Sequence, residues 1–172
     1  MQVGQPAPQF ELEAYNAGQI KKIRLTDYKG KWVVLFFYPR DFTFVCPTEL
    51  KGFAHAQPDF ERKNAVILSA STDSVFSHKA WFEKELPEVK YAVLADTAHT
   101  LSRAYGVLLE DNGAALRGTF IIDPQGMLQW MVISNLNVGR SVAETLRVLE
   151  ALQTGDLCPI EWKPGAKTLG KA

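Results

Sequence analysis

The sequence predicts an α/β fold in which helices flank a mixed central β-sheet. Two continuous apolar runs, at residues 32–39 (WVVLFFYP) and 65–71 (AVILSAS), are typical of strands buried on both faces, and segments of helical periodicity follow each of them. Late in the chain, two apolar stretches flank Pro124-Gln125-Gly126, which indicates a β-hairpin. Early parallel strands followed by a late hairpin predict a sheet of mixed direction.

The first thirty residues are expected to form an irregular start followed by an N-terminal β-hairpin. Apolar residues alternate with polar ones at Phe10 and Leu12, and again at Ile23 and Leu25. The turn-forming segment Asn16-Ala17-Gly18 lies between the two stretches. The first buried strand, 32–39, then follows.

Two helices are predicted in the first half of the chain. One runs from Pro47 to about Lys63, and Pro58 is expected to kink it or to end its first half. After the second buried strand, residues 74–85 predict another helix. Its inner side is expected to carry Val75, Phe76, Trp81 and Phe82.

The second half continues with a short strand at 91–96 and a short helix at 99–106 that Gly106 closes. The hairpin strands are expected at 117–123 and 128–134. Ser141 opens the last helix with a capping box. One face of that helix repeats apolar residues at Val142, Leu146, Leu149 and Leu152.

This β-α-β then β-β-α order suggests a thioredoxin-like fold, with helices on both faces of the mixed sheet. The chain has 172 residues, of which 47% are hydrophobic, so it can bury one substantial core. We expect a single domain, 1–172. Residues 154–172 hold too much glycine and proline for regular structure and are expected to form a C-terminal arm.

Charge and targeting signals exclude several classes of partner. Nineteen basic residues balance nineteen acidic ones, so no strong field attracts nucleic acid or an anionic membrane. The N-terminus shows no secretory pattern, and no apolar run approaches the ~18 residues of a membrane span. A cytoplasmic protein is expected.

The two cysteines, Cys46 and Cys158, are too distant for a CxxC motif, and a bridge between them would be transient in a reducing compartment.

Cys46 stands where a loop ends and a helix is predicted to begin. Pro47 suits the first helical turn, so free backbone N–H groups and the positive end of the helix dipole favour the thiolate, which is the nucleophile. The Thr43 hydroxyl can reach back toward the sulfur, and Pro39 can shield the site without donating an N–H. From position alone, a cysteine at such a junction is more often packed than reactive, so both interpretations stay open.

Several segments together resemble the peroxiredoxins. Residues 39–46 (PRDFTFVC) match the P-x-x-x-T-x-x-C motif of that family, and Pro47-Thr48-Glu49 is similar to the subfamily that contains the peroxidase component of alkyl hydroperoxide reductase (AhpC) and the typical two-cysteine enzymes. Residues 117–126 (RGTFIIDPQG), 137–153 and 155–165 (GDLCPIEWKPG) resemble further segments of the family, in the same order. The resemblance spans nearly the whole chain.

The resemblance implies a thiol-dependent peroxidase that reduces hydrogen peroxide and organic hydroperoxides, in antioxidant defence and redox homeostasis. Cys46 is then the peroxidatic cysteine, which becomes a sulfenic acid. Thr43 matches the residue that binds the peroxide, and Pro39 matches the shielding proline. Arg117 matches the arginine that stabilises the thiolate and orients the peroxide, a role suited to a charge that is not lost.

Two further residues are candidates for supporting the site. Glu49 lies one helical turn beyond Cys46 and is expected to hold an active-site arginine by an ion pair. Arg140 is a second candidate partner, although it can equally be an ordinary residue before the Ser141 cap. The implied chemistry needs no metal, flavin or haem, and we expect no cofactor. The three histidines lack metal-ligand spacing and are interpreted as structural or surface residues: His55, His78 and His99.

Cys158 matches the resolving cysteine of the family. By resemblance it comes from the partner subunit of a head-to-tail homodimer, so that the disulfide with Cys46 is intermolecular. An intrachain structural disulfide is the alternative. Trp162 is expected to pack the arm onto the neighbouring subunit, or else to be part of the core. Family dimers often assemble into decameric rings, and thioredoxin or a dedicated flavoprotein disulfide reductase is the implied electron donor.

The chain departs from those relatives that excess peroxide inactivates easily. They carry a Gly-Gly-Leu-Gly insertion before the arginine strand and a C-terminal Tyr-Phe pair, whereas residues 110–115 read EDNGAA and no tyrosine or phenylalanine follows Phe120. The chain resembles the robust, bacterial type.

Two other functions compete with the peroxidase. A thiol-disulfide oxidoreductase would need CxxC spacing, which is absent, and a holdase chaperone acting through oligomer surfaces stays open.

Overall fold

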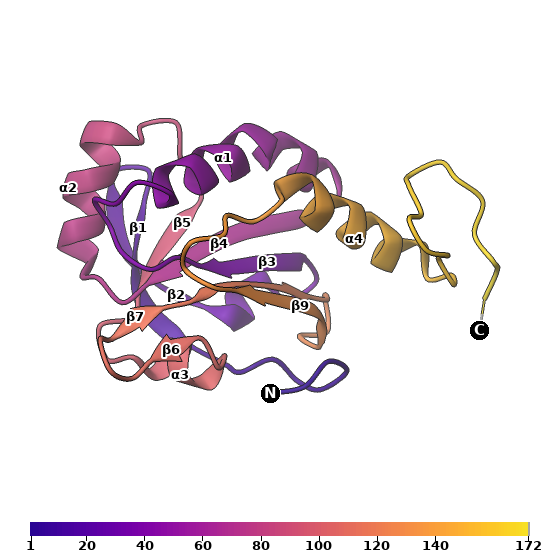
Figure 1. Cartoon of the computed structure of the whole chain (residues 1–172), viewed down its shortest axis with the longest axis horizontal. Coiled ribbons are helices and arrows are strands. Elements are labelled where there is room, and N and C mark those ends of the chain that lie inside the picture. Colours follow the sequence, from indigo (N-terminus) through magenta and orange to yellow (C-terminus); the bar gives the residue numbers. More distant parts are fainter. Residues whose placement is uncertain (172) are drawn as a thin grey trace.

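A seven-stranded mixed sheet forms the centre of the computed structural model, which describes residues 1–171 (Figure 1). Its strand order is β2-β1-β5-β4-β3-β8-β9. The strands are β1 Glu11–Asn16, β2 Gln19–Arg24, β3 Trp32–Phe37, β4 Ala65–Ser71, β5 Ala92–Ala95, β8 Arg117–Ile122 and β9 Leu128–Ser134. The predicted fold class and the N-terminal hairpin, β1–β2, are confirmed.

The direction of the strands changes across the sheet. β3, β4 and β5 run parallel, whereas β1 and β8 add antiparallel strands on their two sides. Val34 in β3 pairs with Ile67 in β4 and with Ile121 in β8. Both faces of β3 are covered, which explains why its sequence is continuously apolar and does not alternate.

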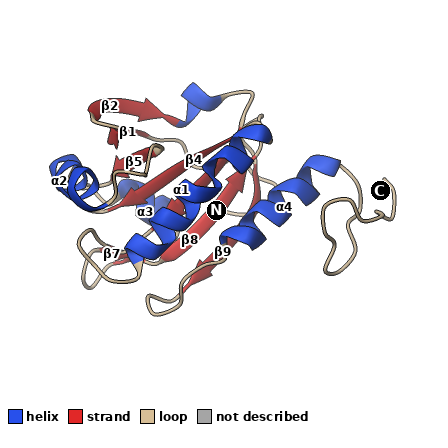
Figure 2. Ribbon diagram, turned by 90° about the horizontal axis from the view of Figure 1, so that it is seen from above, coloured by secondary structure: helices blue, strands red, loops and turns tan. Residues whose placement is uncertain are grey.

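Helices cover both faces of the sheet (Figures 1 and 2). On one face lie α1 (Cys46–Arg62), α2 (Val75–Glu85) and α4 (Val142–Thr154). The short helix α3 (Thr100–Ala104) and the 3₁₀ helix η1 (Leu25–Tyr28) lie on the other. In the described residues, no helix is long and apolar enough to cross a membrane.

The helix predicted from Pro47 to about Lys63 is confirmed as α1, and one prediction about α2 needs correction. Pro58 does not end the first half of α1, which continues to Arg62 with Phe53 and Phe60 fully buried on its apolar face. In α2, Phe76 is 72% exposed and not on the inner side. The buried positions 75, 78, 81 and 82 follow the helical repeat, and position 76 falls outside that stripe.

The last helix and the arm follow the sequence closely. Ser141 Oγ accepts a hydrogen bond from the Glu144 N–H at 3.1 Å, and Gly155, with φ +66°, ends the helix in the left-handed conformation. Residues 155–171 contain no helix or strand. Trp162 is buried within its own chain, where its carbonyl accepts a bond from Arg147 Nη1, so it packs the arm onto α4.

A small second hairpin lies before β8 and was not predicted. It consists of β6 (Leu108–Leu109) and β7 (Ala114–Ala115), each of only two residues, too short to leave a periodic pattern. Its loop contacts the segment that leads to Cys46, since Arg40 Nη2 donates a hydrogen bond to the Asn112 carbonyl at 2.6 Å.

Candidate active site

Cys46 lies at the first residue of α1, directly after the loop that leaves β3. Val45 precedes it in a helical conformation, and its carbonyl accepts the N–H groups of Thr48 and Glu49. Cys46 is fully buried, and so is Pro39 at the start of the loop. The sulfur therefore sits at the positive end of a 17-residue helix and out of contact with bulk water.

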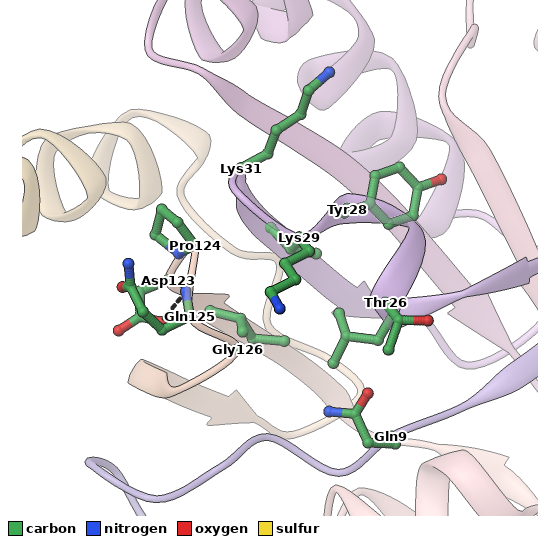
Figure 3. A pocket seen from close by; sticks show the side chains of 12 residues that line it. Gln9, Thr26, Tyr28, Lys29, Lys31, Asp123, Pro124, Gln125 and Gly126 are labelled. Carbon is green, nitrogen blue, oxygen red and sulfur yellow. Dashed lines mark hydrogen bonds between the residues drawn. The ribbon is translucent and has the colours of Figure 1, made fainter.

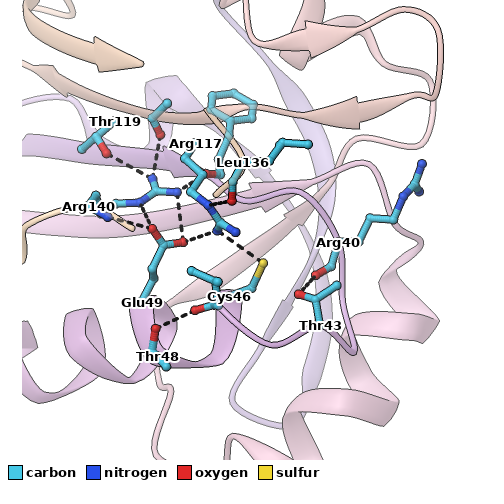
Figure 4. Close-up of polar contacts among 12 residues, drawn as sticks. Arg40, Thr43, Cys46, Thr48, Glu49, Arg117, Thr119, Leu136 and Arg140 are labelled. Carbon is cyan, nitrogen blue, oxygen red and sulfur yellow. Dashed lines mark hydrogen bonds and ion pairs between the residues drawn. The ribbon is translucent and has the colours of Figure 1, made fainter. Parts of the chain in front are cut away.

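Arg117 connects the sulfur to a buried carboxylate (Figure 4). Its Nη1 lies 3.5 Å from Cys46 Sγ and 2.6 Å from Glu49 Oε2. Its Nε donates to the Leu136 carbonyl at 2.8 Å, which fixes the plane of the guanidinium. Arg117 begins β8, and its side chain is 4% exposed. The expected ion pair of Glu49 with an active-site arginine is present.

Arg140 is the second arginine on Glu49. Its Nε and its backbone N–H both donate to Glu49 Oε1, at 2.9 and 3.0 Å. Its Nη1 donates to the Gly118 carbonyl, and its guanidinium carbon lies 4.9 Å from the centre of the Phe36 ring. Burial lowers the pKa of Arg140 from its ordinary value, and the charge of Glu49 opposes that shift. Arg140 is thus a buried partner of Glu49 and not an ordinary residue before a helix cap.

The charges of this cluster do not cancel without the sulfur. Two buried guanidiniums, of Arg117 and Arg140, surround a single carboxylate, Glu49, which leaves one positive charge in surplus. An uncompensated charge in a protein interior is costly, and a negative Cys46 sulfur beside Arg117 would neutralise it. The cluster and the helix N-terminus therefore both place positive charge beside the sulfur.

Thr43 lies in the same loop, but the structure places its hydroxyl differently from the sequence-based expectation. Thr43 Oγ1 donates to the Arg40 carbonyl at 3.0 Å, and no hydrogen bond joins it to Cys46 within residues 1–171. The bond to the Arg40 carbonyl uses the Thr43 O–H as donor and leaves the lone pairs of Oγ1 free to accept a hydrogen bond from a bound molecule (Figure 4). Phe42, just before it, has a left-handed backbone with φ +55°.

The structure does not bring Cys158 to Cys46. α1 and α4 run side by side in the same direction, with Gln153 bonded to the Lys63 carbonyl at their far ends. Cys46 begins α1, whereas Cys158 Sγ lies 3.8 Å from the Ala151 carbonyl near the end of α4. A helix of this length spans about 25 Å, so the two cysteines lie about 20 Å apart. A disulfide requires Cα atoms within about 7 Å of each other.

The sulfur of Cys158 borders a hollow of about 540 Å³ that Trp130, Arg147 and Ile160 also line. A separate hollow, of about 370 Å³, lies between η1, the start of β3 and the β8–β9 turn (Figure 3). Lys29, Lys31 and Asp123 are among its lining residues. It is at the opposite end of β3 from Cys46, so it takes no part in the chemistry of that cysteine.

Sequence reasoning missed two contributors to the site. The Leu136 carbonyl, which holds Arg117, is a backbone group and leaves no signal in residue types. The pair of Asp41 and His78 lies directly behind the active-site loop, with Nδ1 and Oδ2 2.8 Å apart. Asp41 belongs to the PRDFTFVC motif. His78 falls on the apolar stripe of α2, and a histidine at such a position was the signal in the sequence that could have indicated a buried polar partner.

A mixed sheet of thioredoxin-like type with a buried thiol, a helix N-terminus and a surplus guanidinium defines a cysteine-dependent redox enzyme. The profile of the AhpC/TSA family matches residues 3–131. Peroxiredoxin prdx-2 of Caenorhabditis elegans is 52% identical over 97% of this chain and 88% of the relative, and a thioredoxin peroxidase of Echinococcus granulosus is 48% identical over 96% and 91%.

Solved structures agree with these relatives. The reduced 2-Cys peroxiredoxin of Plasmodium vivax superimposes with a TM-score of 0.94 at 36% identity, covering 98% of this chain and 92% of that one. AhpC of Enterococcus faecalis gives 0.88 at 37% identity, covering 91% and 98%. The chain belongs to the AhpC/TSA family of peroxiredoxins and is an enzyme with peroxidase activity. The family predicted from the sequence is confirmed.

Proposed function

We propose that this peroxiredoxin reduces hydrogen peroxide and organic hydroperoxides through a sulfenic acid on Cys46 and a disulfide between Cys46 and the Cys158 of a second subunit. The observation that carries the proposal is the contact of Arg117 Nη1 with Cys46 Sγ at 3.5 Å, in a buried cluster with a surplus positive charge. We further propose that it works as a single domain, 1–172, in the cytoplasm, in antioxidant defence.

In the first step, the Cys46 thiolate attacks the nearer oxygen of the peroxide. The S–O bond forms as the O–O bond breaks, sulfur is oxidised to the sulfenic acid, and the leaving oxygen takes a proton to depart as water or an alcohol. Arg117 is positioned to stabilise the charge that develops on the oxygens, because its guanidinium is already fixed by Glu49 and the Leu136 carbonyl. Thr43 Oγ1 can accept a hydrogen bond from the peroxide O–H, and Pro39 shields the thiolate from water.

In the second step, the thiol of Cys158 attacks the sulfenic sulfur, which gives a disulfide and releases water. Within one chain the two sulfurs lie at opposite ends of the parallel helices α1 and α4. This separation supports a head-to-tail homodimer in which the arm of one subunit reaches the α1 N-terminus of the other. The first turn of α1 must unwind for the sulfurs to meet, since Cys46 is fully buried.

In the third step, a dithiol reductant returns both cysteines to thiols and is itself oxidised to a disulfide. Thioredoxin is one candidate, and one relative carries the name thioredoxin peroxidase. A dedicated flavoprotein disulfide reductase is the other. The homodimer is also proposed to assemble into a decameric ring. No cofactor is assigned to this chain.

A coupled assay tests the proposal. NAD(P)H consumption is followed with hydrogen peroxide or an organic hydroperoxide and with each reductant in turn. Cys46→Ser should abolish turnover. Cys158→Ser should not sustain turnover: its sulfenic acid has no resolving thiol, so the variant should consume only the few equivalents of peroxide per Cys46 that oxidise the sulfur further. Sustained turnover by Cys46→Ser would remove Cys46 from the mechanism, and sustained turnover by Cys158→Ser would remove Cys158.

A further inference from the structure

The hollow of about 370 Å³ in Figure 3, which we call the η1 hollow, lies apart from both cysteines. Its lining comes from Gln9 and from two stretches of chain, within residues 25–33 and 122–126. None of these residues belongs to the Cys46 cluster or lines the hollow beside Cys158. Sites for small organic molecules usually measure about 300–1,000 Å³, so the η1 hollow has the size for one.

The floor of the η1 hollow is apolar. Leu25, Val33 and Ile122, from η1, β3 and β8, are at most 5% exposed and belong to the core on that face of the sheet. The half-buried ring of Tyr28 adds to the lining. Burial, with the charge of Asp27, raises the pKa of Tyr28, so its phenol stays neutral. The floor therefore favours a ligand with an aliphatic body, which gains free energy by leaving water.

Lys29 brings a positive charge into the η1 hollow. In Figure 3 its ammonium group lies among the lining side chains, between Gly126 and Thr26, whereas Lys31 points away from them. Within residues 1–171, the lysines that form ion pairs are Lys22, Lys51 and Lys63. Lys29 and Lys31 are not among them. The Lys29 ammonium is thus a hydrogen-bond donor without an acidic partner beside an apolar floor.

The acidic residue of the lining, Asp123, is already engaged by its own turn. Its Oδ1 accepts the backbone N–H groups of Gln125 and Met127, both at 2.9 Å. Its Oδ2 accepts a hydrogen bond from the side-chain amide of Gln129 at 2.6 Å. These three donors hold the carboxylate in the β8–β9 turn and compensate its charge. The counter-ion of Lys29 in the η1 hollow can therefore come from a ligand.

We infer that the η1 hollow binds a small aliphatic carboxylate, with its chain on the apolar floor and its carboxylate on the ammonium of Lys29. A hydrogen bond between two charged groups is stronger than one between neutral groups, so the carboxylate gives selectivity over an alcohol of the same length. A medium-chain fatty acid is a ligand of this class. The inference is independent of the proposed peroxidase chemistry, because binding is measured without peroxide.

Saturation-transfer nuclear magnetic resonance on the reduced full-length protein tests the site with octanoate and with octanol, its neutral counterpart. Octanoate should bind with a dissociation constant of about 1 mM, the range open to a ligand of its size. Octanol leaves the Lys29 ammonium without a partner and should bind about five-fold more weakly. Absence of octanoate binding at several times that concentration overturns the inference, and so does equal binding of octanol.

Three variants at exposed positions of the lining locate the binding energy. Lys29→Gln should weaken octanoate binding about five-fold and leave octanol binding unchanged. Lys31→Gln removes an equal charge from a side chain that points away, so this matched control should change neither. Thr26→Trp places a bulky ring in the η1 hollow and should weaken the binding of both ligands. Near-ultraviolet circular dichroism confirms that each variant is folded.

Equal octanoate affinity in Lys29→Gln and Lys31→Gln would show that the Lys29 charge does not hold the carboxylate. Unchanged binding of both ligands in Thr26→Trp would place them outside the η1 hollow. Either result overturns the inference.

Reductive methylation of lysines locates the carboxylate on the wild-type protein. Formaldehyde and a borane reductant methylate exposed lysines, and tandem mass spectrometry gives the extent at each position. Octanoate at twice its dissociation constant leaves about a third of the sites free, so methylation of Lys29 should slow about three-fold. Lys31, two residues away, is the internal control and should react at an unchanged rate. Equal protection of Lys29 and Lys31, or protection of neither, contradicts the assignment of Lys29.

Discussion

Cys46 and Glu49 are both contacted by one nitrogen, Arg117 Nη1, which lies 3.5 Å from Cys46 Sγ and 2.6 Å from Glu49 Oε2. One helical turn separates the two residues on α1, so the helix itself sets their spacing. The carboxylate orients the guanidinium, and the guanidinium faces the sulfur. Changes at Glu49 should therefore be felt at Cys46 without any contact between the two.

Glu49→Gln should lower the rate constant with hydrogen peroxide by about 10²-fold, because Arg117 loses the partner that fixes it. Alkylation of Cys46 by iodoacetamide should not slow, since the variant leaves more positive charge beside the thiolate. The folded state should lose about 3–5 kcal/mol, measured by denaturant unfolding, because two buried arginines lose their shared carboxylate. Glu144→Gln, an exposed carboxylate paired with Arg147, is the matched control and should change neither rate. An equal loss of peroxide and iodoacetamide reactivity would contradict a role through Arg117.

Thr43→Val should cost much more peroxidase rate than Thr43→Ser. Serine keeps a hydroxyl that can bond both the Arg40 carbonyl and a peroxide, whereas valine keeps only the shape, and one such hydrogen bond is worth about 10²–10³ in rate. Stopped-flow reaction of reduced protein with hydrogen peroxide measures the difference. Equal rates for the two variants would show that Thr43 only packs.

The arrangement of the sheet could be predicted because its signals are local and mutually consistent. The apolar run before Cys46 is typical of a strand covered on both faces, and Ser141 marks the start of α4. Where a tertiary contact overrides local preference, the sequence left the outcome open. Pro58 disfavours a continuous helix, but α1 runs through it with buried aromatic residues, Phe53 and Phe60, on either side.

The sequence predicted a residue of the candidate site only where the residue's type and motif alone indicate its role. Arg117 and Glu49 could be named from motifs, but the charge surplus that they create with Arg140 depends on three segments meeting in space. His78 could only be interpreted as structural or surface, because its partners Asp41 and Leu94 come from a loop and from β5. Sequence spacing gives no measure of such distances.

Oxidation by about one equivalent of peroxide should convert the protein into a disulfide-linked dimer on non-reducing gels, which dithiothreitol returns to monomer. The reason is the separation of Cys46 and Cys158 at opposite ends of the paired helices α1 and α4. A mixture of Cys46→Ser and Cys158→Ser protein should still give one mixed dimer after subunit exchange, whereas neither variant alone should form this bond. Oxidised wild type that migrates only as a monomer would show that Cys158 resolves within its own chain.

The enzyme should resist overoxidation at modest peroxide excess. For the disulfide to form, the first turn of α1 must unwind; Val45 provides no side-chain cap for this turn, and the neighbouring Phe44 is 97% exposed. The arm around Cys158 is equally accessible, with Ile160 92% exposed. Fast disulfide formation then competes with a second peroxide attack, which would give an irreversible sulfinic acid.

Mass spectrometry during turnover at rising peroxide should accordingly find mostly disulfide in the wild type, whereas Cys158→Ser, which has no resolving thiol, should accumulate sulfinic and sulfonic acid on Cys46. Substantial sulfinic acid in the wild type at modest peroxide excess would mean that disulfide formation does not outrun the second attack of peroxide.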